Sequence, residues 1–510
     1  MLSRVPSYSV AGVEGFPVAV EVFVSGGLPA MDVVGLPDAA VKESRDRVRV
    51  ALMNSGFTMP IGRVTVNLAP ADIKKEGPAF DLPIAIAILK ASNQIITKDL
   101  SEVVLFGELS LDGSLQPVKG ALPMVIGAHQ QGFKAVILPA GNAQEVVTVQ
   151  DMDVYPAKNL KDVIYHLTGR EKIEKQAQKS YESCLKETVF LTDMADVKGQ
   201  TGARRALEVA CAGGHNIIMI GVPGAGKTML ARCIPSILPP MTYEEALETT
   251  RIHSVTGALR NQGMLTARPF RAPHHSASVP SLVGGGSRAV PGEVSLAHNG
   301  VLFLDEIAEF SKAALEALRQ PLEDGIAAVT RVNAKSAYQA KCMLVASMNP
   351  CPCGYSGSKV KKCRCSTGEI RRYQDRLSGP LLDRIDIHIE VDSVPVEEIR
   401  ATGHEESSQT ILERVQAARR IQLERFEGTS IHCNAQMDNK MVKQHCGLNK
   451  EAEGLLHMAV KSQSISMRGY TRILKVARTI ADLKGEKEIG VDDVAEAIQY
   501  RSLDDKYWRN

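Results

Sequence analysis

The sequence predicts an α/β protein with several folding units: a central parallel sheet with helices on both faces, a helical region after it and an α+β domain before it. The 510 residues exceed the usual length of one domain several times, so more than one core is expected. Short apolar runs alternate with helical patterns up to about residue 395, and the periodicity after that is helical throughout. Hydrophobic residues make up 44% of the chain and charged residues 23%, which excludes a disordered or fibrous protein.

Changes in composition predict the domain boundaries. Residues 1–168 combine strand-like and helix-like segments with Gly and Pro between them, as in a mixed α+β domain. Residues 169–190 are polar and charged without an apolar stripe, which predicts a linker, with a solvated helix as the alternative. The parallel-sheet core then covers residues 191–395, and a helical lid covers residues 396–510.

Charge and cysteine usage exclude other classes of protein. Lys and Arg together number 60 and Asp and Glu 58, for a net charge of +2, so binding to nucleic acid would require a local basic patch. No run of 18 apolar residues occurs and the first residues lack an apolar leader segment, so we expect a cytoplasmic protein without a membrane partner. Ten cysteines are too few for a disulfide scaffold in a chain of this length.

A glycine-rich loop carries the strongest chemical signal. An apolar strand at residues 216–220 leads into GVPGAGKT at residues 221–228 and then into a helix, which is the order that the motif G-x-x-x-x-G-K-[ST] requires. The N–H groups of such a loop face phosphates, its lysine adds a positive charge, and its last hydroxyl binds Mg²⁺. The sequence therefore predicts a site for ATP and Mg²⁺ that is formed by Gly221, Val222, Pro223, Gly224, Ala225, Gly226, Lys227 and Thr228.

Two further strands end in polar residues that suit phosphoryl transfer. The strand VLFLDEI contains Asp305 and Glu306 at its end, and the strand CMLVASMNP ends near Asn349. The carboxyl ends of parallel strands meet at one edge of the sheet, where ligands bind. We expect Asp305 to hold Mg²⁺, Glu306 to orient and polarise the attacking water, and Asn349 to orient water or the γ-phosphate.

Two arginines follow these strands. Arg376 and Arg384 lie before the strand IDIHIEV, and one of them could reach a γ-phosphate bound by a neighbouring subunit. An arginine supplied in this way contributes on the order of 10³–10⁵ in rate, so a single chain would be nearly inert. A surface ion pair is the alternative for an Asp-Arg pair such as this one.

These motifs, with the helical segment SMRGYTRILKVARTIADL, resemble those of AAA+ ATPases in the branch of the magnesium chelatases and MCM-type motors. Over nearly its whole length the chain resembles the ComM/YifB family of magnesium chelatase-like proteins, from AGVEGFPVAVEV through FRAPHHSAS to NPCPCGY. The resemblance implies that Asn349 is sensor 1 and Arg384 the arginine finger. It implies Arg468 as sensor 2, with Arg472 on the same helix competing for this role.

Two segments are predicted to grip DNA. Residues 268–300 form a long insertion that contains Arg271; in the branch that the chain resembles, such an insertion projects into the pore of a ring, and a plain surface loop is the alternative. Residues 327–341 predict two extended runs about a turn, with Arg331 and Lys335 near its tip. Six copies of each tip in a ring would concentrate positive charge for contacts with phosphates.

Four cysteines crowd into the segment CPCGYSGSKVKKCRC. Two pairs of thiolates suit a closed tetrahedral Zn²⁺ site, although the C-x-C spacing is rarer than C-x-x-C, and free thiols in a loop are the alternative. The same segment opens the most basic stretch of the chain, and we expect its Lys361 and Lys362 to contact DNA phosphates. The expected zinc ligands are Cys351, Cys353, Cys363 and Cys365.

The N-terminal domain resembles the proteolytic domain of Lon-type enzymes, through KKEGPAFDLPIAIAI and FGELSLDGSLQPVKGALPMVIGAHQQGFKAVILPAGN. Those enzymes use a Ser nucleophile and a Lys base. This chain has Ala79 and Leu122 at the two positions, and neither side chain can attack a carbonyl or accept a proton. Lys119 is close to the second position but has no nucleophile to activate. We therefore expect a scaffold for the ring or a collar that faces DNA, without peptidase activity.

Two functions from different classes fit these observations. The first is a homo-hexameric, ATP-driven DNA motor; the family resemblance implies helicase or branch-migration work on single-stranded or branched DNA in natural transformation, with proteins of the recombinase pathway as partners. The second is a protein-remodelling or magnesium-chelatase-type ATPase chaperone, which would use the same ATP site on a protein partner. The segments predicted to grip DNA favour the first.

Overall fold

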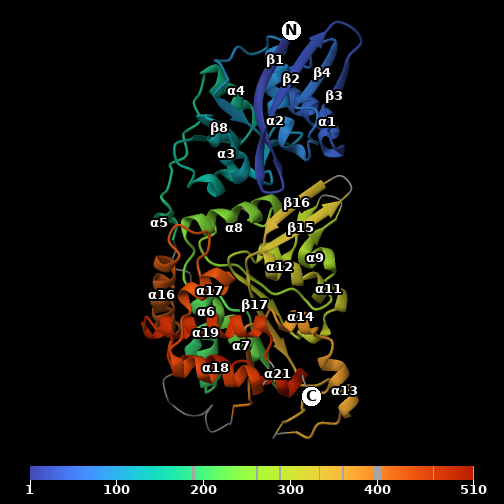
Figure 1. Ribbon diagram of the computed structural model, residues 1–510. Helices are drawn as coiled ribbons and strands as arrows, with labels where there is room; N and C mark the ends of the chain where they lie inside the picture. The colour runs from blue at the N-terminus through green and yellow to red at the C-terminus, as the bar shows by residue number, and fades with distance from the viewer. Residues whose placement is uncertain are drawn as a thin grey trace. The chain divides into compact units, whose positions relative to one another are not determined.

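The computed structural model describes residues 1–185, 190–259, 262–286, 289–331, 334–358, 361–394, 405–462 and 465–508. Internal contacts divide the chain into two compact units (Figure 1). Unit 1 consists of Met1–Lys186 and Thr242–Thr266, and unit 2 of Glu187–Met241 and Ala267–Asn510. A segment from the middle of the chain therefore belongs to the N-terminal unit.

The first half of unit 1 is a four-stranded sheet with two helices. Its elements are β1 (Leu2–Ala11), β2 (Glu14–Ser25), β3 (Ala30–Val34), α1 (Ala39–Asn54), β4 (Arg63–Ala69), η1 (Pro78–Phe80) and α2 (Asp81–Ala91). The strand order is β1-β2-β4-β3, with antiparallel pairs except for β3 and β4. Alternate side chains of β2 are buried, among them Val18, Val20 and Val22, because one face of the sheet covers the core. Helix α2, almost wholly buried, packs on β1 and β2.

The second half of unit 1 is built on a parallel sheet with the order β5-β8-β9. Its elements are β5 (Val103–Leu105), β6 (Glu108–Leu109), β7 (Leu115–Gln116), α3 (Ala121–Gln130), β8 (Ala135–Pro139), η2 (Ala140–Val146), β9 (Asp153–Ala157), α4 (Leu160–Thr168) and α5 (Tyr181–Cys184). An apolar core forms between these elements and includes both Ala79 and Leu122. The mixed α/β character expected for the N-terminal region is thus present.

Helix α8 (Tyr243–Thr256) completes unit 1, although the sequence places it after the glycine-rich loop. The helix begins with a capping box in which the Glu245 N–H donates to Thr242 and the Thr242 N–H donates to Glu245. It packs against α3, its Leu247 lies against the apolar core that contains Leu122, and the Gly120 N–H donates to the Ser254 carbonyl at 3.0 Å. The positions of the missing Lon-type residues therefore lie in the core against which this segment packs.

The sheet of unit 2 has five parallel strands in the order β11-β14-β17-β10-β18. The strands are β10 (Ile217–Ile220), β11 (Phe270–Arg271), β14 (Val301–Leu304), β17 (Met343–Met348) and β18 (Ile387–Glu390). All residues of β10, β14 and β17 are buried, as expected for strands with helices on both faces. The predicted α/β class with a parallel sheet is confirmed.

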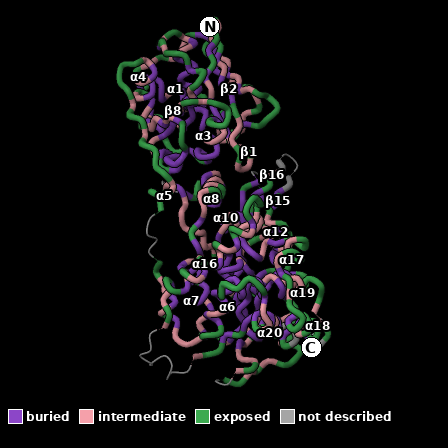
Figure 2. The backbone as a smooth tube through the Cα atoms, turned by 60° about the vertical axis from the view of Figure 1, so that its left-hand side comes forward, coloured by how far each residue is buried: buried purple, intermediate pink, exposed green. Residues whose placement is uncertain are grey.

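Helices surround this sheet and continue into the C-terminal region. They are α6 (Thr201–Gly213), α7 (Lys227–Ile237), α9 (Val279–Val283), α10 (Glu293–Leu296), α11 (Lys312–Ala317), α12 (Arg319–Asp324), α13 (Thr367–Gln374), α14 (Gly379–Leu382), α16 (Ser408–Arg425), α17 (Asn439–His445), α18 (Lys450–Ser462), α19 (Met467–Lys484), α20 (Val491–Gln499) and α21 (Leu503–Trp508), with short 3₁₀ turns η3 (Met194–Asp196), η4 (Ile307–Glu309) and η5 (Asn434–Gln436). Helices α16 and α19 pack on α6, and one apolar core joins them to the sheet, with buried backbone in purple (Figure 2).

Unit 2 also contains two hairpins. β15 (Ile326–Arg331) pairs antiparallel with β16 (Ala334–Gln339), as predicted, and β12 (Gly284–Gly285) pairs with β13 (Val290–Pro291) inside the long insertion. The register pairs Arg331 with Ala334, so both predicted basic residues lie beside the turn. The side chains of Arg331 and Lys335 lie outside the described residues.

The predicted boundaries differ from the units in three respects. Residues 169–186 of the predicted linker belong to unit 1, and the predicted core and helical lid together belong to unit 2. Residues 242–266 were predicted to be part of the core domain, whereas their contacts place them in unit 1. The predicted boundary at residue 395 and part of the predicted linker lie outside the described residues. No helix in the described ranges has the length and apolar character that a membrane span needs, and the expected cytoplasmic location stays a prediction.

Candidate functional site

The glycine-rich loop connects β10 to α7 at the edge of the sheet. The Gly221 N–H donates to the Met348 carbonyl at 3.1 Å, which fixes the loop to the neighbouring strand β17. Gly224 and Gly226 have φ angles of 80° and 90°, and a Cβ built on either residue would have no neighbour within 4 Å. Backbone conformation, and not space, therefore requires glycine at these positions. The loop ends directly at the first residue of α7, so the N-terminus of this helix faces the same region.

Lys227 is buried in the loop that it terminates. Its ammonium donates to the carbonyls of Gly221 at 2.6 Å and Val222 at 3.1 Å, and to Asn349 Oδ1 at 3.1 Å. Burial lowers the pKa of Lys227, and the nearby carboxylates of Asp305 and Glu306 oppose this effect. The structure thus brings together the predicted phosphate-binding lysine and the predicted sensor amide, from segments more than a hundred residues apart.

Asp305 lies at the point where strands β14 and β17 end. The strand register pairs Leu304 with Ala346, which places Asp305 beside Ser347. The Ser347 hydroxyl donates to Asp305 Oδ1, and the Thr228 hydroxyl donates to Oδ2 at 3.0 Å. Carboxylate and hydroxyl oxygens are ligands that Mg²⁺ prefers, so this pair of residues fits the predicted magnesium site.

Glu306 has an unusual backbone and an accessible carboxylate. Its φ angle is 51°, a left-handed conformation that is uncommon outside glycine, and its N–H donates to the Ser347 hydroxyl at 3.2 Å. The side chain is 53% exposed, and His275 Nδ1 of the long insertion lies 3.9 Å from its Oε2. The carboxylate therefore faces solvent beside Asp305, where the sequence predicts the water-activating group.

The predicted arginine finger and sensor 2 lie together around Glu323 on α12. Arg384 forms an ion pair with Glu323 and donates to the Pro380 carbonyl at 2.5 Å, and its side chain is only 9% exposed. Arg468 Nη2 lies 3.7 Å from the other Glu323 oxygen and is 62% exposed. Arg472 instead pairs with the buried Asp386. The roles of these three arginines stay predictions.

The carboxyl group of Asp386 is an anchor for this region. His215 Nδ1 lies 3.2 Å from its Oδ2, and His215 Nε2 lies 2.8 Å from the Thr479 hydroxyl of α19. Although burial opposes it, Arg472 and His215 hold the pKa of Asp386 far below its usual range. The charged carboxylate therefore joins α19 to the start of strand β18.

Two other predicted arginines have partners within the chain. Arg271 makes two hydrogen bonds to Glu293, at 2.6 and 2.8 Å, and these close the base of the insertion. Arg376 donates to the Ala308 carbonyl and to Glu309, both at 2.9 Å. The structure thus gives each of these guanidinium groups a structural partner, and the DNA contact of Arg271 stays a prediction.

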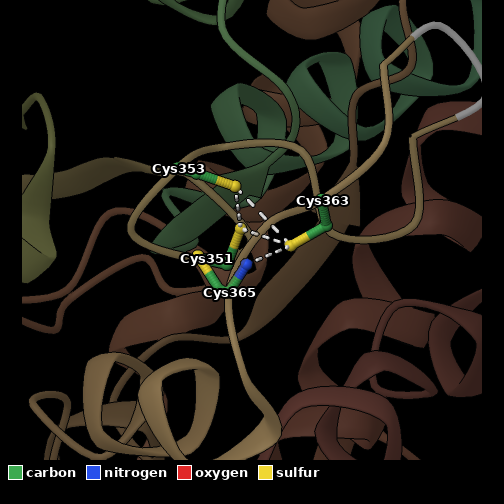
Figure 3. Close-up of side chains that lie close together, drawn as sticks. All are labelled: Cys351, Cys353, Cys363 and Cys365. Atoms are coloured by element: carbon green, nitrogen blue, oxygen red, sulfur yellow. Dashed lines mark hydrogen bonds between the residues drawn. The ribbon is translucent and has the colours of Figure 1, made fainter.

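The four predicted zinc ligands converge (Figure 3). The Sγ atoms of Cys351, Cys353 and Cys363 are 3.4 to 3.7 Å apart, and all four sulfur atoms lie within 4.8 Å of one another. Zn–S bonds of about 2.3 Å in a tetrahedron place sulfurs about 3.8 Å apart, so the cluster fits Zn²⁺ closely. The backbone N–H groups of Arg364 and Tyr355 lower the pKa of Cys353 to about 6, which favours the thiolate that a metal requires.

The cysteine cluster adjoins the nucleotide site. A Cβ on Gly354 would lie 2.6 Å from Pro223 of the glycine-rich loop and 3.9 Å from Asn349, so this glycine permits the close packing of the two loops. The expected DNA residues Lys361 and Lys362 are exposed, and the Lys361 ammonium lies 4.6 Å from the centre of the Tyr355 ring.

Comparison with known proteins accounts for most of the chain. Three protein-family models match it: "Magnesium chelatase, subunit ChlI" over residues 193–399, "Subunit ChlI of Mg-chelatase" over residues 20–142 and "Magnesium chelatase, subunit ChlI C-terminal" over residues 405–501. Competence protein ComM of Haemophilus influenzae is 45% identical over 98% of this chain and 98% of its own length. The chain belongs to the ComM/YifB family. The protein YifB of Escherichia coli is 43% identical over 99% of this chain and 97% of its own length.

Membership of the ComM/YifB family makes the protein a magnesium chelatase-like AAA+ ATPase, which implies hydrolysis of ATP with Mg²⁺. The N-terminal resemblance is also found: a Lon protease of Methanosphaera stadtmanae is 29% identical over 26% of this chain and 16% of its own length. In this ComM/YifB chain, Ala79 and Leu122 both lie in the apolar core of unit 1.

Two residues near the ATP site were not predicted from the sequence. Ser347 binds both Asp305 and the backbone of Glu306, and its signal was a hydroxyl in an otherwise apolar strand, two positions before Asn349. Gln200 donates from its side-chain amide to the Ala225 carbonyl at 3.2 Å. No sequence signal marked Gln200, because its contact depends on how the segment before α6 folds back to the loop.

Proposed function

We propose that this ComM/YifB protein is an ATP-driven, hexameric DNA motor with helicase or branch-migration activity. One observation carries the proposal: a single unit holds a glycine-rich loop that meets Asp305 and Asn349 at the sheet edge, and a β-hairpin with two basic residues beside its turn. The name of the Haemophilus relative supports a place in natural transformation. Proteins of the recombinase pathway would then be its partners.

The ATP site has the parts that phosphoryl transfer needs. In this proposal the loop and Lys227 hold the phosphates, and Thr228 and Asp305 hold Mg²⁺, which neutralises charge that develops on the phosphates. Ser347 keeps Asp305 in place. Glu306 then accepts a proton from the attacking water. Its exposed carboxylate lies beside Asp305, and among the described residues no hydrogen bond to another carboxyl or amide side chain occupies it. Asn349 orients the water or the γ-phosphate.

Two features support a complete ring as the active form. The predicted finger Arg384 and sensor Arg468 lie together and, among the described residues, form no hydrogen bond or ion pair with the loop of their own chain. An arginine that does not serve its own nucleotide is available for a neighbour's. The proposal therefore places both guanidinium groups at the site of the next subunit in a homo-hexamer.

The cysteine cluster has a structural role in this proposal. Zn²⁺ held by Cys351, Cys353, Cys363 and Cys365 would fix the loop that packs on Pro223 and presents Lys361 and Lys362 to DNA phosphates. Among the described residues the site offers four sulfurs and no further ligand, which suits a structural metal and not a catalytic one.

A second function has an observation in its favour. The family models that match residues 193–399 and 405–501 are those of a magnesium chelatase subunit, which fits a protein-remodelling or chelatase-type ATPase. Such a protein would use the same ATP site and act on a protein partner, without need of basic residues at a hairpin turn.

An ATPase assay separates the two functions. ATP turnover is measured without nucleic acid and with single-stranded, duplex or forked DNA, at several salt concentrations. The DNA motor predicts stimulation that salt weakens, because phosphate contacts release counterions. Turnover that does not respond to any of the three DNAs would reject the motor and leave the remodelling ATPase. The Lys227→Ala variant is the control for contaminating activity.

A further inference from the structure

Glu323 is shared by two arginines, and this sets it apart from the other carboxylates of the region. Arg384 pairs with one of its oxygens and Arg468 lies 3.7 Å from the other. By contrast, Arg319 has Glu316 at 2.5 Å and Arg472 has Asp386 as partners of their own. Glu323 is therefore the point at which the predicted finger and the predicted sensor meet.

The pairing of Arg384 with Glu323 excludes another use of the same N–H groups. Nη1 donates to the Pro380 carbonyl, Nη2 faces Glu323, and Nε is buried without a hydrogen-bond partner among the described residues. A carboxylate matches the guanidinium fork in the same way as two phosphate oxygens do. Arg384 therefore has to leave Glu323 before it can bind a phosphoryl group on another chain.

The cluster is electrostatically poised for such an exchange. Burial lowers the pKa of Arg384, and the positive charges of Arg319, Arg468 and Arg472 lower it further. Arg319 and Arg472 have carboxylates of their own, so Arg384 and Arg468 share the single negative charge of Glu323, and this pair favours an incoming anion. Its side chain is 48% exposed, so no packing locks it in place.

Glu323 is also directly connected to the hairpin that is predicted to grip DNA. It lies in the last turn of α12, which ends at Gly325 with a φ angle of 66°, and β15 begins at the next residue. The Ala340 N–H donates to the Gly325 carbonyl at 2.8 Å, so both strands of the hairpin are tied to this turn. A displacement of the hairpin therefore moves the backbone that carries Glu323.

We propose that Glu323 is a positioning residue that withholds Arg384 and Arg468 from the nucleotide of a neighbouring subunit until the β15–β16 hairpin is displaced by DNA. The inference rests on the proposed function for its ring and its DNA. It adds a residue that links DNA contact to hydrolysis, through the exchange of one ion pair for another.

The test uses mixed rings so that only one arginine site is measured. Donor subunits carry Lys227→Ala, which removes their own hydrolysis, and acceptor subunits carry Arg384→Ala, so turnover arises only where a donor arginine reaches an acceptor nucleotide. Glu323→Gln is added to the donor; it keeps the shape of the side chain and removes its charge. Asp324→Asn is the matched control, because Asp324 is the next residue and has no ion pair in the described part of the chain.

Glu323→Gln donors are expected to raise the kcat of the mixture without DNA about fivefold, the size expected for loss of an ion pair of this exposure. The KM for ATP should not change, because the acceptor loop binds the nucleotide, and the further stimulation by DNA should shrink by the same factor. Asp324→Asn donors should match the parent donors. Thermal unfolding is recorded for each variant, and Glu323→Asp, which shortens the side chain, replaces Glu323→Gln if that variant does not fold.

Three results would overturn the inference. They are unchanged or lower turnover with Glu323→Gln donors, an equal effect of Asp324→Asn, and absence of turnover with every donor, since there would then be no arginine in trans to withhold. The proposed function is judged separately, from stimulation of the unmodified protein by DNA.

Discussion

Glu306 and Glu309 lie three residues apart on the turn after β14 but have different surroundings. Glu309 is paired with Arg376 at 2.9 Å, whereas the Glu306 carboxylate faces solvent beside Asp305. Glu306→Gln should bind ATP normally and lose about 10²- to 10⁴-fold in kcat, the usual contribution of a general base. Single-turnover hydrolysis and binding of a fluorescent ATP analogue measure the two effects.

Glu309→Gln is the matched control for this prediction and should retain most of its activity. Lys227→Ala should instead abolish binding of the nucleotide, because it removes the buried charge at the loop. Normal turnover by Glu306→Gln would remove Glu306 from the role of base.

A second prediction at the scale of one residue concerns Glu145 in unit 1. Its side chain is buried, accepts a hydrogen bond from Asn142 at 2.7 Å, and has its pKa raised by burial to about 7. Between the ordinary value of 4.5 and about 7 the folded state binds the proton and the unfolded state does not, so stability falls as pH rises through this window. The loss by pH 8 should be on the order of 3 kcal/mol.

Denaturant unfolding of the Glu145→Gln variant and of the unmodified protein, at pH values from 5 to about 8, checks this prediction. The unfolding free energy of the unmodified protein, relative to that of the Glu145→Gln variant, should fall as pH rises through this range. Glu102→Gln, which removes an exposed partner of Lys134, is the control and should show no such trend. A difference that is constant with pH would mean that Glu145 is charged in the folded protein.

At the scale of elements, the β15–β16 hairpin carries the predicted contact with DNA. Replacing Arg331 and Lys335 together by Ala should weaken DNA binding and reduce the slope of log affinity against log salt by about 2, or somewhat less with single strands. Basal ATPase activity without DNA should change little. Fluorescence anisotropy with labelled oligonucleotides measures affinity and its salt dependence. The exposed Lys312→Ala in α11 is a control that removes one positive charge outside the hairpin. An unchanged slope would place the DNA contact elsewhere.

The cysteine loop is the second element with a direct test. Elemental analysis of the purified protein should find one zinc ion per chain, and Cys351→Ser with Cys353→Ser should lose it. Because Gly354 of this loop packs on Pro223, loss of the metal should also lower ATP turnover. Cys184→Ser with Cys342→Ser, outside the cluster, should retain both metal and activity. A full zinc content in the first double variant would assign the metal to other ligands.

The sequence predicted best what a local pattern determines. The glycine-rich loop, the strands that end at Asp305 and Asn349, and the hairpin at residues 326–339 are each set by short-range order, and all are present. The place of α8 was not predicted, because most of its buried residues are polar and its sequence does not show which unit it packs against. Ser347 was missed for a related reason: its role comes from the pairing of two strands and not from either one alone.

At the scale of the whole molecule, the pairing of Arg384 and Arg468 with Glu323, and not with their own glycine-rich loop, leads to a prediction about assembly. Arg384→Ala and Lys227→Ala subunits should each be inactive, and a mixture should recover part of the hydrolysis at interfaces that combine an intact arginine with an intact loop. ATP turnover, measured as a function of the mixing ratio, checks this recovery of hydrolysis. Light scattering confirms that the subunits assemble. A mixture as inactive as its parts would argue for an arginine that serves its own chain.

The chain crosses between the two units three times, because residues 242–266 belong to unit 1 while the residues on both sides belong to unit 2. Cleavage in the polar segment after α4 would therefore leave two fragments that still adhere, since Leu247 and Ser254 stay packed in the N-terminal unit. A truncation that begins after this segment would expose the apolar side of α8 to water and invite aggregation. This inserted segment leaves unit 2 after α7, the helix that follows the glycine-rich loop, and returns to it just before β11, the strand that pairs with β14. The chain therefore connects the N-terminal unit to two elements of the nucleotide-binding core independently of the polar segment.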